Sequence, residues 1–109
     1  MDVSSLQVSV VSGESGPVLV LAGEADFTSV ARLEEALTPQ TSGQAVQLTI
    51  DVTDLRYADS ASVRTLVMAA LKVRSRAGSV TLLNPQPPVA RMLDLLCLDE
   101  IFAVRSQQV

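Results

Sequence analysis

The 109-residue chain carries a net charge of −4, with 48% hydrophobic and 18% charged residues, a composition typical of one globular domain. The acidic balance and the presence of only two phenylalanines, one tyrosine and no tryptophan argue against a nucleic-acid partner, because phosphate backbones attract cations and bases stack on aromatic rings. With no histidine and one cysteine, the chain offers neither an internal disulfide nor a zinc-ligand set. We therefore expect no metal and no cofactor.

The N-terminal segment lacks the basic stretch and apolar core of a signal peptide. No apolar run approaches the roughly 20 residues that span a bilayer. These features predict a cytoplasmic protein without direct membrane insertion.

The first half of the chain predicts two strands, a helix and a third strand. Apolar residues alternate with polar ones from Leu6 to Val10, and a short apolar run covers Val18–Ala22 after a turn rich in glycine and serine. The helix is predicted from apolar residues at helical spacing: Val30, Leu33, Ala36 and Leu37. Either Asp26 or Thr28 caps it, and Pro39 and Gly43 end it. The third strand is expected over Ala45–Ile50.

The second half predicts helix, strand, helix and strand. The first of these helices runs from Ser60 to Arg76, with Gly78 as the residue that ends it. A strand over Val80–Leu83 follows, then a third helix and a short last strand over Ile101–Val104. The apolar stripe of the third helix comprises Val89, Met92, Leu93 and Leu96.

The predicted order is β-β-α-β-α-β-α-β, which is an α/β fold with a mixed sheet and the helices mainly on one face. We expect one domain over residues 1–109, with a core from about residue 5 to residue 104.

The junction Asp59-Ser60-Ala61-Ser62, where a strand gives way to a helix, is the candidate functional centre. A serine nucleophile needs a base that takes its proton, usually histidine. The chain has no histidine, and its one lysine, Lys72, lies about three turns further along the same helix. A hydrolase is therefore disfavoured, and we expect the protein to have no enzymatic activity of its own. From residue types alone, Asp59 or Ser60 caps the helix.

Other polar clusters have structural explanations. Glu24 and Asp26 lie at a strand-to-helix corner, where the positive end of the helix dipole stabilises carboxylates. Asp51 and Asp54 could act as metal ligands, but the sequence shows neither the glycine-rich loop nor the positioned lysine that magnesium phosphotransfer sites usually use. Cys97 lies on an apolar helix face and is expected to fill the core.

Taken together, several stretches resemble the STAS domain, a family that includes bacterial anti-sigma factor antagonists and the C-terminal domains of sulfate transporters. Leu21–Asp26 (LAGEAD) is similar to the family's Leu-x-Gly-Glu-x-Asp corner, and Asp51–Ser60 (DVTDLRYADS) to its Asp-Leu-Ser-x-Val-x-Phe-Ile-Asp-Ser stretch. Residues 82–102 resemble its closing segment. Where the family commonly continues with Ser/Thr-Gly after the aspartate and serine, this chain has Ala61-Ser62.

The resemblance implies an anti-sigma factor antagonist that binds an anti-sigma factor, itself a serine-protein kinase, and so releases a sigma factor for transcription. By position, the phosphorylated serine of the family corresponds to Ser60, with Ser62 as a second candidate. The expected partner-binding residues are Asp26, Asp59, Ser60, Ala61, Ser62 and Arg64. The alternative is a STAS accessory subunit of a membrane transporter ATPase complex for lipids or anions. A homodimer is also possible.

Overall fold

The computed structural model describes residues 6–43 and 46–106. Its strands are β1 (Leu6–Gly13), β2 (Gly16–Ala25), β3 (Gln47–Ala58), β4 (Ser79–Leu83) and β5 (Ala103–Arg105). Its α-helices are α1 (Val30–Gln40), α2 (Ser60–Arg74) and α3 (Pro87–Leu95), with short 3-10 helices η1 (Phe27–Ser29) and η2 (Leu98–Glu100). The predicted order of elements is confirmed.

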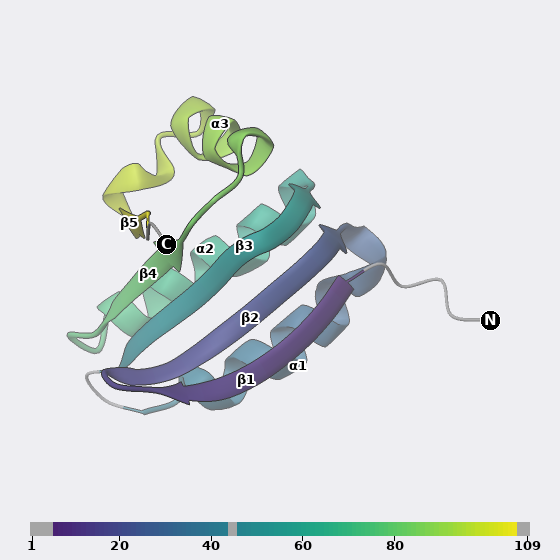
Figure 1. The fold of residues 1–109 in the computed structure, drawn as a ribbon. Coiled ribbons are helices and arrows are strands. Elements are labelled where there is room, and N and C mark those ends of the chain that lie inside the picture. Colours follow the sequence, from purple (N-terminus) through teal and green to yellow (C-terminus); the bar gives the residue numbers. More distant parts are fainter. Residues whose placement is uncertain (1–5, 44–45, 107–109) are drawn as a thin grey trace.

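The five strands form one mixed sheet in the order β1-β2-β3-β4-β5 (Figure 1). The hairpin of β1 and β2 is antiparallel, and each later strand pairs in parallel with the one before it. Parallel neighbours need a crossover connection, which α1, α2 and α3 with η2 provide in turn. The predicted α/β fold with a mixed sheet is therefore confirmed.

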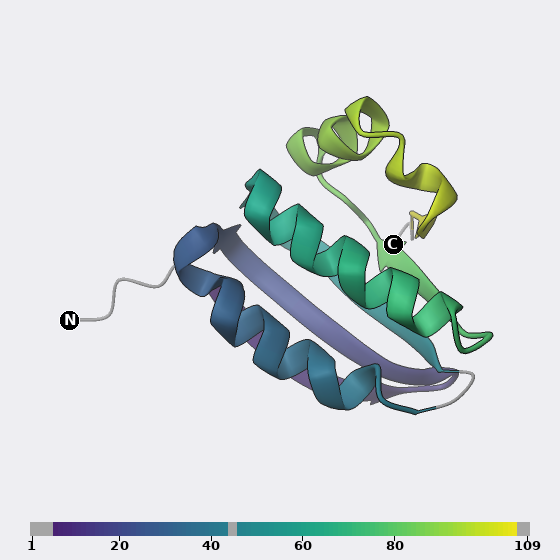
Figure 2. The ribbon, with the colours of Figure 1, turned by 180° about the vertical axis from the view of Figure 1, so that it is seen from behind.

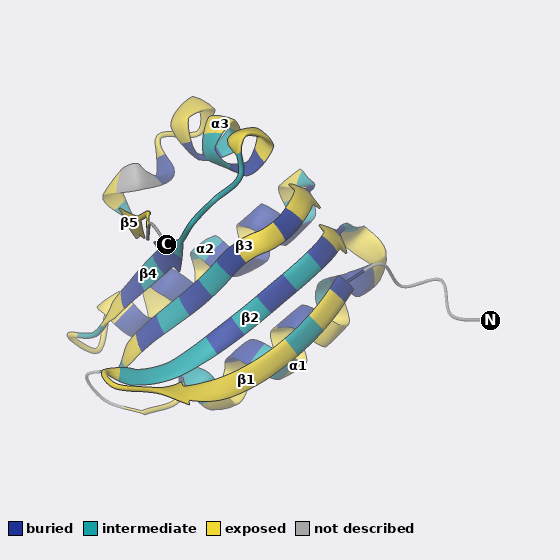
Figure 3. Ribbon diagram, viewed as in Figure 1, coloured by how far each residue is buried: buried dark blue, intermediate teal, exposed yellow. Residues whose placement is uncertain are grey.

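Two of the three helices, α1 and α2, lie side by side across one face of the sheet (Figure 2). The strand residues on that face form an aliphatic core, whose least exposed members include Leu19, Leu21, Ile50, Val52 and Leu82. Residues between them are less buried, and this alternation is visible along the strands in Figure 3. Helix α3 lies beyond β4 and contacts β3 and η2.

Strand β3 is longer than predicted. Ala45 lies outside the described residues, and the strand continues through Ala58 rather than ending at Ile50. Its pairing with β2 contains two register shifts, and such bulges bend a strand while keeping it in the sheet. In the part of the strand that was not predicted, Asp51 accepts hydrogen bonds from the backbone N–H and the hydroxyl of Thr53.

The predicted ends of two helices also need correction. Helix α1 continues past Pro39 to Gln40. After α2, the left-handed conformation that glycine favours is adopted by Ala77 (φ 65°), not by Gly78. Gly78 is required for another reason: a Cβ atom there would collide with the backbone of Val46.

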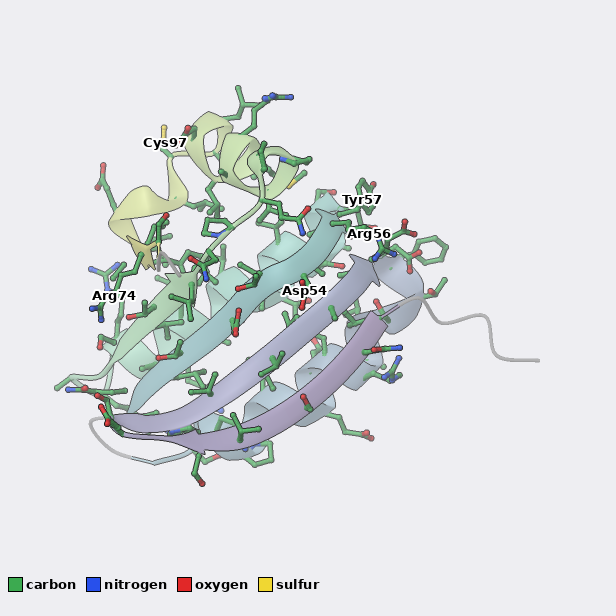
Figure 4. The ribbon with its side chains drawn as sticks, viewed as in Figure 1. Asp54, Arg56, Tyr57, Arg74 and Cys97 are labelled. Atoms are coloured by element: carbon green, nitrogen blue, oxygen red, sulfur yellow. The ribbon has the colours of Figure 1, made fainter. Side chains whose placement is uncertain are left out.

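The C-terminal region differs in detail from the prediction. Helix α3 ends at Leu95, and Cys97 adopts the left-handed conformation with its side chain exposed (Figure 4). The prediction that Cys97 fills the core is therefore wrong. The last strand starts at Ala103 rather than Ile101, and Phe102, directly before it, packs into the core.

Candidate docking edge

The candidate site lies at one edge of the sheet, where β2 and β3 end and two helices begin. Ala25 and Ala58 are paired at the ends of these strands, and the Asp59 N–H donates to the Ala25 carbonyl at 3.0 Å. Helix η1 follows β2 and contacts α2, which follows β3. The parallel pairing thus brings Asp26 and Asp59, far apart in sequence, to the same edge.

Asp59 is the N-cap of α2. Its carboxylate accepts a hydrogen bond from the Ser62 N–H at 2.9 Å, and its carbonyl accepts from the Val63 N–H at 2.9 Å. This cap fixes where the helix starts and leaves Ser60 as the first helical residue, with its side chain exposed. The hydroxyl of Ser60 is therefore presented to solvent beside first-turn N–H groups, which favour an added anion.

Ser62 is oriented quite differently from Ser60. It is fully buried (0% exposed), and its hydroxyl has no hydrogen-bond partner among the described residues. A kinase does not reach Ser62 in this conformation, so Ser60 is the accessible member of the candidate pair. The helical spacing of Ser62 with the buried residues Leu66 and Ala70 predicts this burial.

Replacing Ser62 with alanine is expected to raise the free energy of unfolding by about 1 kcal/mol, because a buried hydroxyl without a partner loses its hydration. Urea denaturation of the variant measures this. Ser60→Ala is the matched control, with an expected change within about 0.5 kcal/mol at an exposed position. A less stable Ser62→Ala variant would show that the hydroxyl makes a stabilising hydrogen bond in solution.

Asp26 caps the other helix entry. Its carboxylate accepts from the hydroxyl and N–H of Thr28, while its own N–H donates to Ser29 Oγ at 3.1 Å. The hydrogen bonds from the Thr28 hydroxyl and backbone hold the pKa of Asp26 below its ordinary value of 3.8. Asp26 thus caps the 3-10 helix η1, which leads into α1, whereas α1 itself begins after Ser29 without a side-chain cap, so neither predicted residue caps α1 directly.

A lowered pKa in the folded state means that ionised Asp26 stabilises the fold above its ordinary pKa, and that this contribution disappears as the pH falls through the folded pKa. We expect Asp26→Asn to destabilise the protein most near neutral pH, with the difference from wild type shrinking in acid. Urea denaturation across pH measures the difference. An NMR titration midpoint for Asp26 at or above 3.8 would contradict the expectation.

Two exposed aromatic residues, Phe27 and Tyr57, were not predicted as part of the site. Phe27 is 74% exposed and is the first residue of η1. Tyr57 is 48% exposed, and Figure 4 shows it near the end of β3. The chain has only three aromatic residues, and the third, Phe102, is buried. Exposed aromatic side chains are enriched at protein interfaces. We call Asp26, Phe27, Tyr57, Asp59 and Ser60 together the docking edge.

The remaining predicted partner-binding residues extend from the docking edge along α2. Ala61 is half-buried and Arg64 is exposed, on the side of α2 that faces α1. Nearby, Glu24 and Arg56 form an exposed ion pair at 4.0 Å. Glu24 and Asp26 therefore have separate partners and do not act as a carboxylate pair.

The part of the chain that the structure describes gives little support for a metal site or a membrane-spanning helix. No cluster of three or more potential metal ligands occurs there. Within residues 6–43 and 46–106, no helix is both long enough and apolar enough to cross a membrane. The Arg74 guanidinium donates a hydrogen bond to the Glu100 carbonyl. The Arg76 guanidinium donates to the carbonyls of Thr41 and Ser42, so each arginine connects α2 or its end to a distant segment.

The structure is thus a small α/β domain in which two helix entries and two exposed aromatic residues lie at one edge of the sheet. Comparison with known proteins identifies the family. Residues 8–105 match the family model described as "Mlab, STAS domain". The chain belongs to the STAS domain family, as the sequence motifs predicted.

Individual relatives share the fold at low sequence identity. The chain is 25% identical over 88 residues to the anti-sigma-B factor antagonist of Listeria monocytogenes, covering 81% of this chain and 77% of that protein. An anti-sigma factor antagonist from Mycobacterium paratuberculosis superposes with a TM-score of 0.81 at 22% identity, over 92% of this chain and 85% of the other. SpoIIAA in its unphosphorylated form superposes with a TM-score of 0.75 at 23% identity, over 94% and 88%.

Proposed function

We propose that the protein is an anti-sigma factor antagonist of the cytoplasm. It binds an anti-sigma factor that is also a serine-protein kinase, and this binding releases a sigma factor. Phosphorylation of Ser60 by the same kinase ends the binding. The protein itself acts by binding, without catalysis.

The observation that carries the proposal is the position of Ser60. It is exposed, it opens α2 directly after the capping aspartate, and two exposed aromatic residues lie at the same edge. The names of the relatives, antagonists of anti-sigma factors, agree with a role of this kind.

The switch follows from electrostatics. A phosphate on Ser60 adds about −1.5 to −2 charge at a point where Asp59 already contributes a carboxylate. The first-turn N–H groups accommodate the anion within the domain, so the fold is retained. A partner packed on the docking edge meets the new charge and its hydration shell, and the complex dissociates.

A pull-down from lysate of the source cell, analysed by mass spectrometry, tests the proposal. Wild type is expected to capture a serine-kinase-type anti-sigma factor, Ser60→Ala to capture it as well, and Ser60→Asp to lose it. Capture of transporter ATPase subunits instead would replace the proposal with the accessory-subunit function. Equal capture by Ser60→Asp would show that Ser60 is not the switch.

A further inference from the structure

A groove of about 670 Å³ runs between α1 and α2 on the helical face of the domain. Its two ends are marked by Val30 and Ala61 near the docking edge, and by Thr41 and Lys72 at the far end. Each helix contributes eleven residue steps between these ends, which corresponds to about 16 Å or three helical turns. The groove therefore continues the docking edge along the surface.

The floor of the groove is less polar than its composition suggests. Thr38 and Thr65 donate their hydroxyl hydrogens to the carbonyls of Glu34 and Ala61, one turn earlier in the same helix, and Thr41 donates to the Thr38 carbonyl. These hydroxyl donors are thus used within the helices. With Leu37, Met68 and Ala69 also lining it, the groove presents mainly methyl and thioether groups. Met68 is 57% exposed, so its side chain is open to solvent along the groove.

The charges along the groove are unevenly placed. The α2 side carries Arg64 and Lys72, whereas the α1 side carries Glu34. Among the described residues, neither Arg64 nor Lys72 forms an ion pair. The two cations are eight positions apart in the sequence, which places them about 12 Å apart along the axis of α2.

We propose that this groove docks an amphipathic helix of a partner protein. The apolar stripe of that helix packs on the floor, and two acidic residues spaced seven or eight apart lie opposite Arg64 and Lys72. Two parallel helical ridges about three turns long suit a third helix, because side-chain ridges of one helix pack into grooves between others. The two cations select for acidic residues and set the orientation.

The groove shares Ala61 and Arg64 with the predicted partner-binding surface, but neither its floor nor its cations include Ser60. Its test needs no kinase, so it fails or succeeds independently of the proposed function. The probe is an Ala-rich synthetic peptide of about 15 residues, with leucines at i, i+4 and i+7 and two flanking glutamates seven residues apart. A control peptide has lysines in place of both glutamates.

Titration of the ¹⁵N-labelled full chain, followed by amide chemical shifts, measures the binding. The glutamate peptide is expected to shift residues of the groove, including Thr38, Thr65 and Ala69, and to bind at least about tenfold more tightly than the lysine peptide. The double variant Arg64→Glu/Lys72→Glu is expected to reverse this preference. Arg91→Glu changes an exposed residue of α3 outside the groove. It is the matched control and is expected to leave the preference unchanged.

The same titration gives the results that would overturn the proposal. These are no shifts with the glutamate peptide up to millimolar concentration, shifts mapped outside the groove, equal affinity for the two peptides, or an unchanged preference in the double variant. Shifts of the groove residues on concentrating the protein alone would instead show that a second copy of the chain occupies it. Each variant's amide spectrum establishes that it is folded.

Discussion

Replacing Ser60 with aspartate is expected to weaken binding to the anti-sigma factor kinase by about 100-fold or more. The exposed hydroxyl becomes a carboxylate beside Asp59, and a charge buried without a partner at an interface costs several kcal/mol. Because Ser60 is the first residue of α2, where negative charge favours the helix, the fold tolerates the change. Calorimetry with the purified kinase measures the affinity.

Ser60→Ala is the control for that experiment. It removes the hydroxyl without adding charge, so binding is expected to stay within about threefold of wild type, while phosphorylation is lost. A Ser60→Asp variant that binds as tightly as Ser60→Ala would show that charge at this position does not govern the complex.

Removing the Phe27 side chain is expected to reduce affinity for the same partner by about 30-fold, corresponding to roughly 2 kcal/mol for an aromatic hot spot. Phe27 is 74% exposed, so its truncation leaves the free energy of unfolding within about 0.5 kcal/mol of wild type. Binding calorimetry and urea denaturation separate the two effects.

Leu95→Ala provides a matched comparison for Phe27→Ala. Leu95 is also a large, exposed apolar residue (76%), but it is the last residue of α3, and α3 is not one of the two helix entries that form the docking edge. Its truncation is expected to leave the affinity unchanged. Equal losses in the two variants would mean that the partner covers a different or much larger surface.

The sequence predicts the architecture well because local patterns and connection rules agree. Leu19 and Leu21 in β2, and Leu33 and Leu37 in α1, were expected to be apolar positions of their elements, and all four are buried. The motif ending in Asp59-Ser60 placed the start of α2 correctly, since an aspartate before an apolar helical stripe is a strong N-cap signal.

The errors arose where tertiary contacts outweigh local preference. The third strand was expected to end at Ile50, before a stretch of mostly polar residues, but pairing with β2 keeps that stretch in the sheet. A glycine after α2 suggested a helix end at Gly78, yet the close approach of Val46 explains that glycine. Cys97 had the apolar character of a core residue, but the chain turns at that point and exposes it.

The candidate site was only partly predictable. Motif and capping patterns placed Asp26, Asp59 and Ser60, but nothing local indicates whether an aromatic residue is buried, so Phe27 and Tyr57 emerged only from the structure. The groove between α1 and α2 depends on how two helices pack across a sheet, and no spacing in one helix reveals it.

Mapping the phosphorylated residue shows whether Ser60 is the switch. Wild type and Ser60→Ala are incubated with the captured kinase and ATP, and tandem mass spectrometry locates the phosphate. We expect one phosphate on Ser60 of wild type, none on Ser60→Ala, and loss of kinase binding by the phosphorylated protein. Phosphate on another residue, or a phosphorylated protein that still binds, would contradict it.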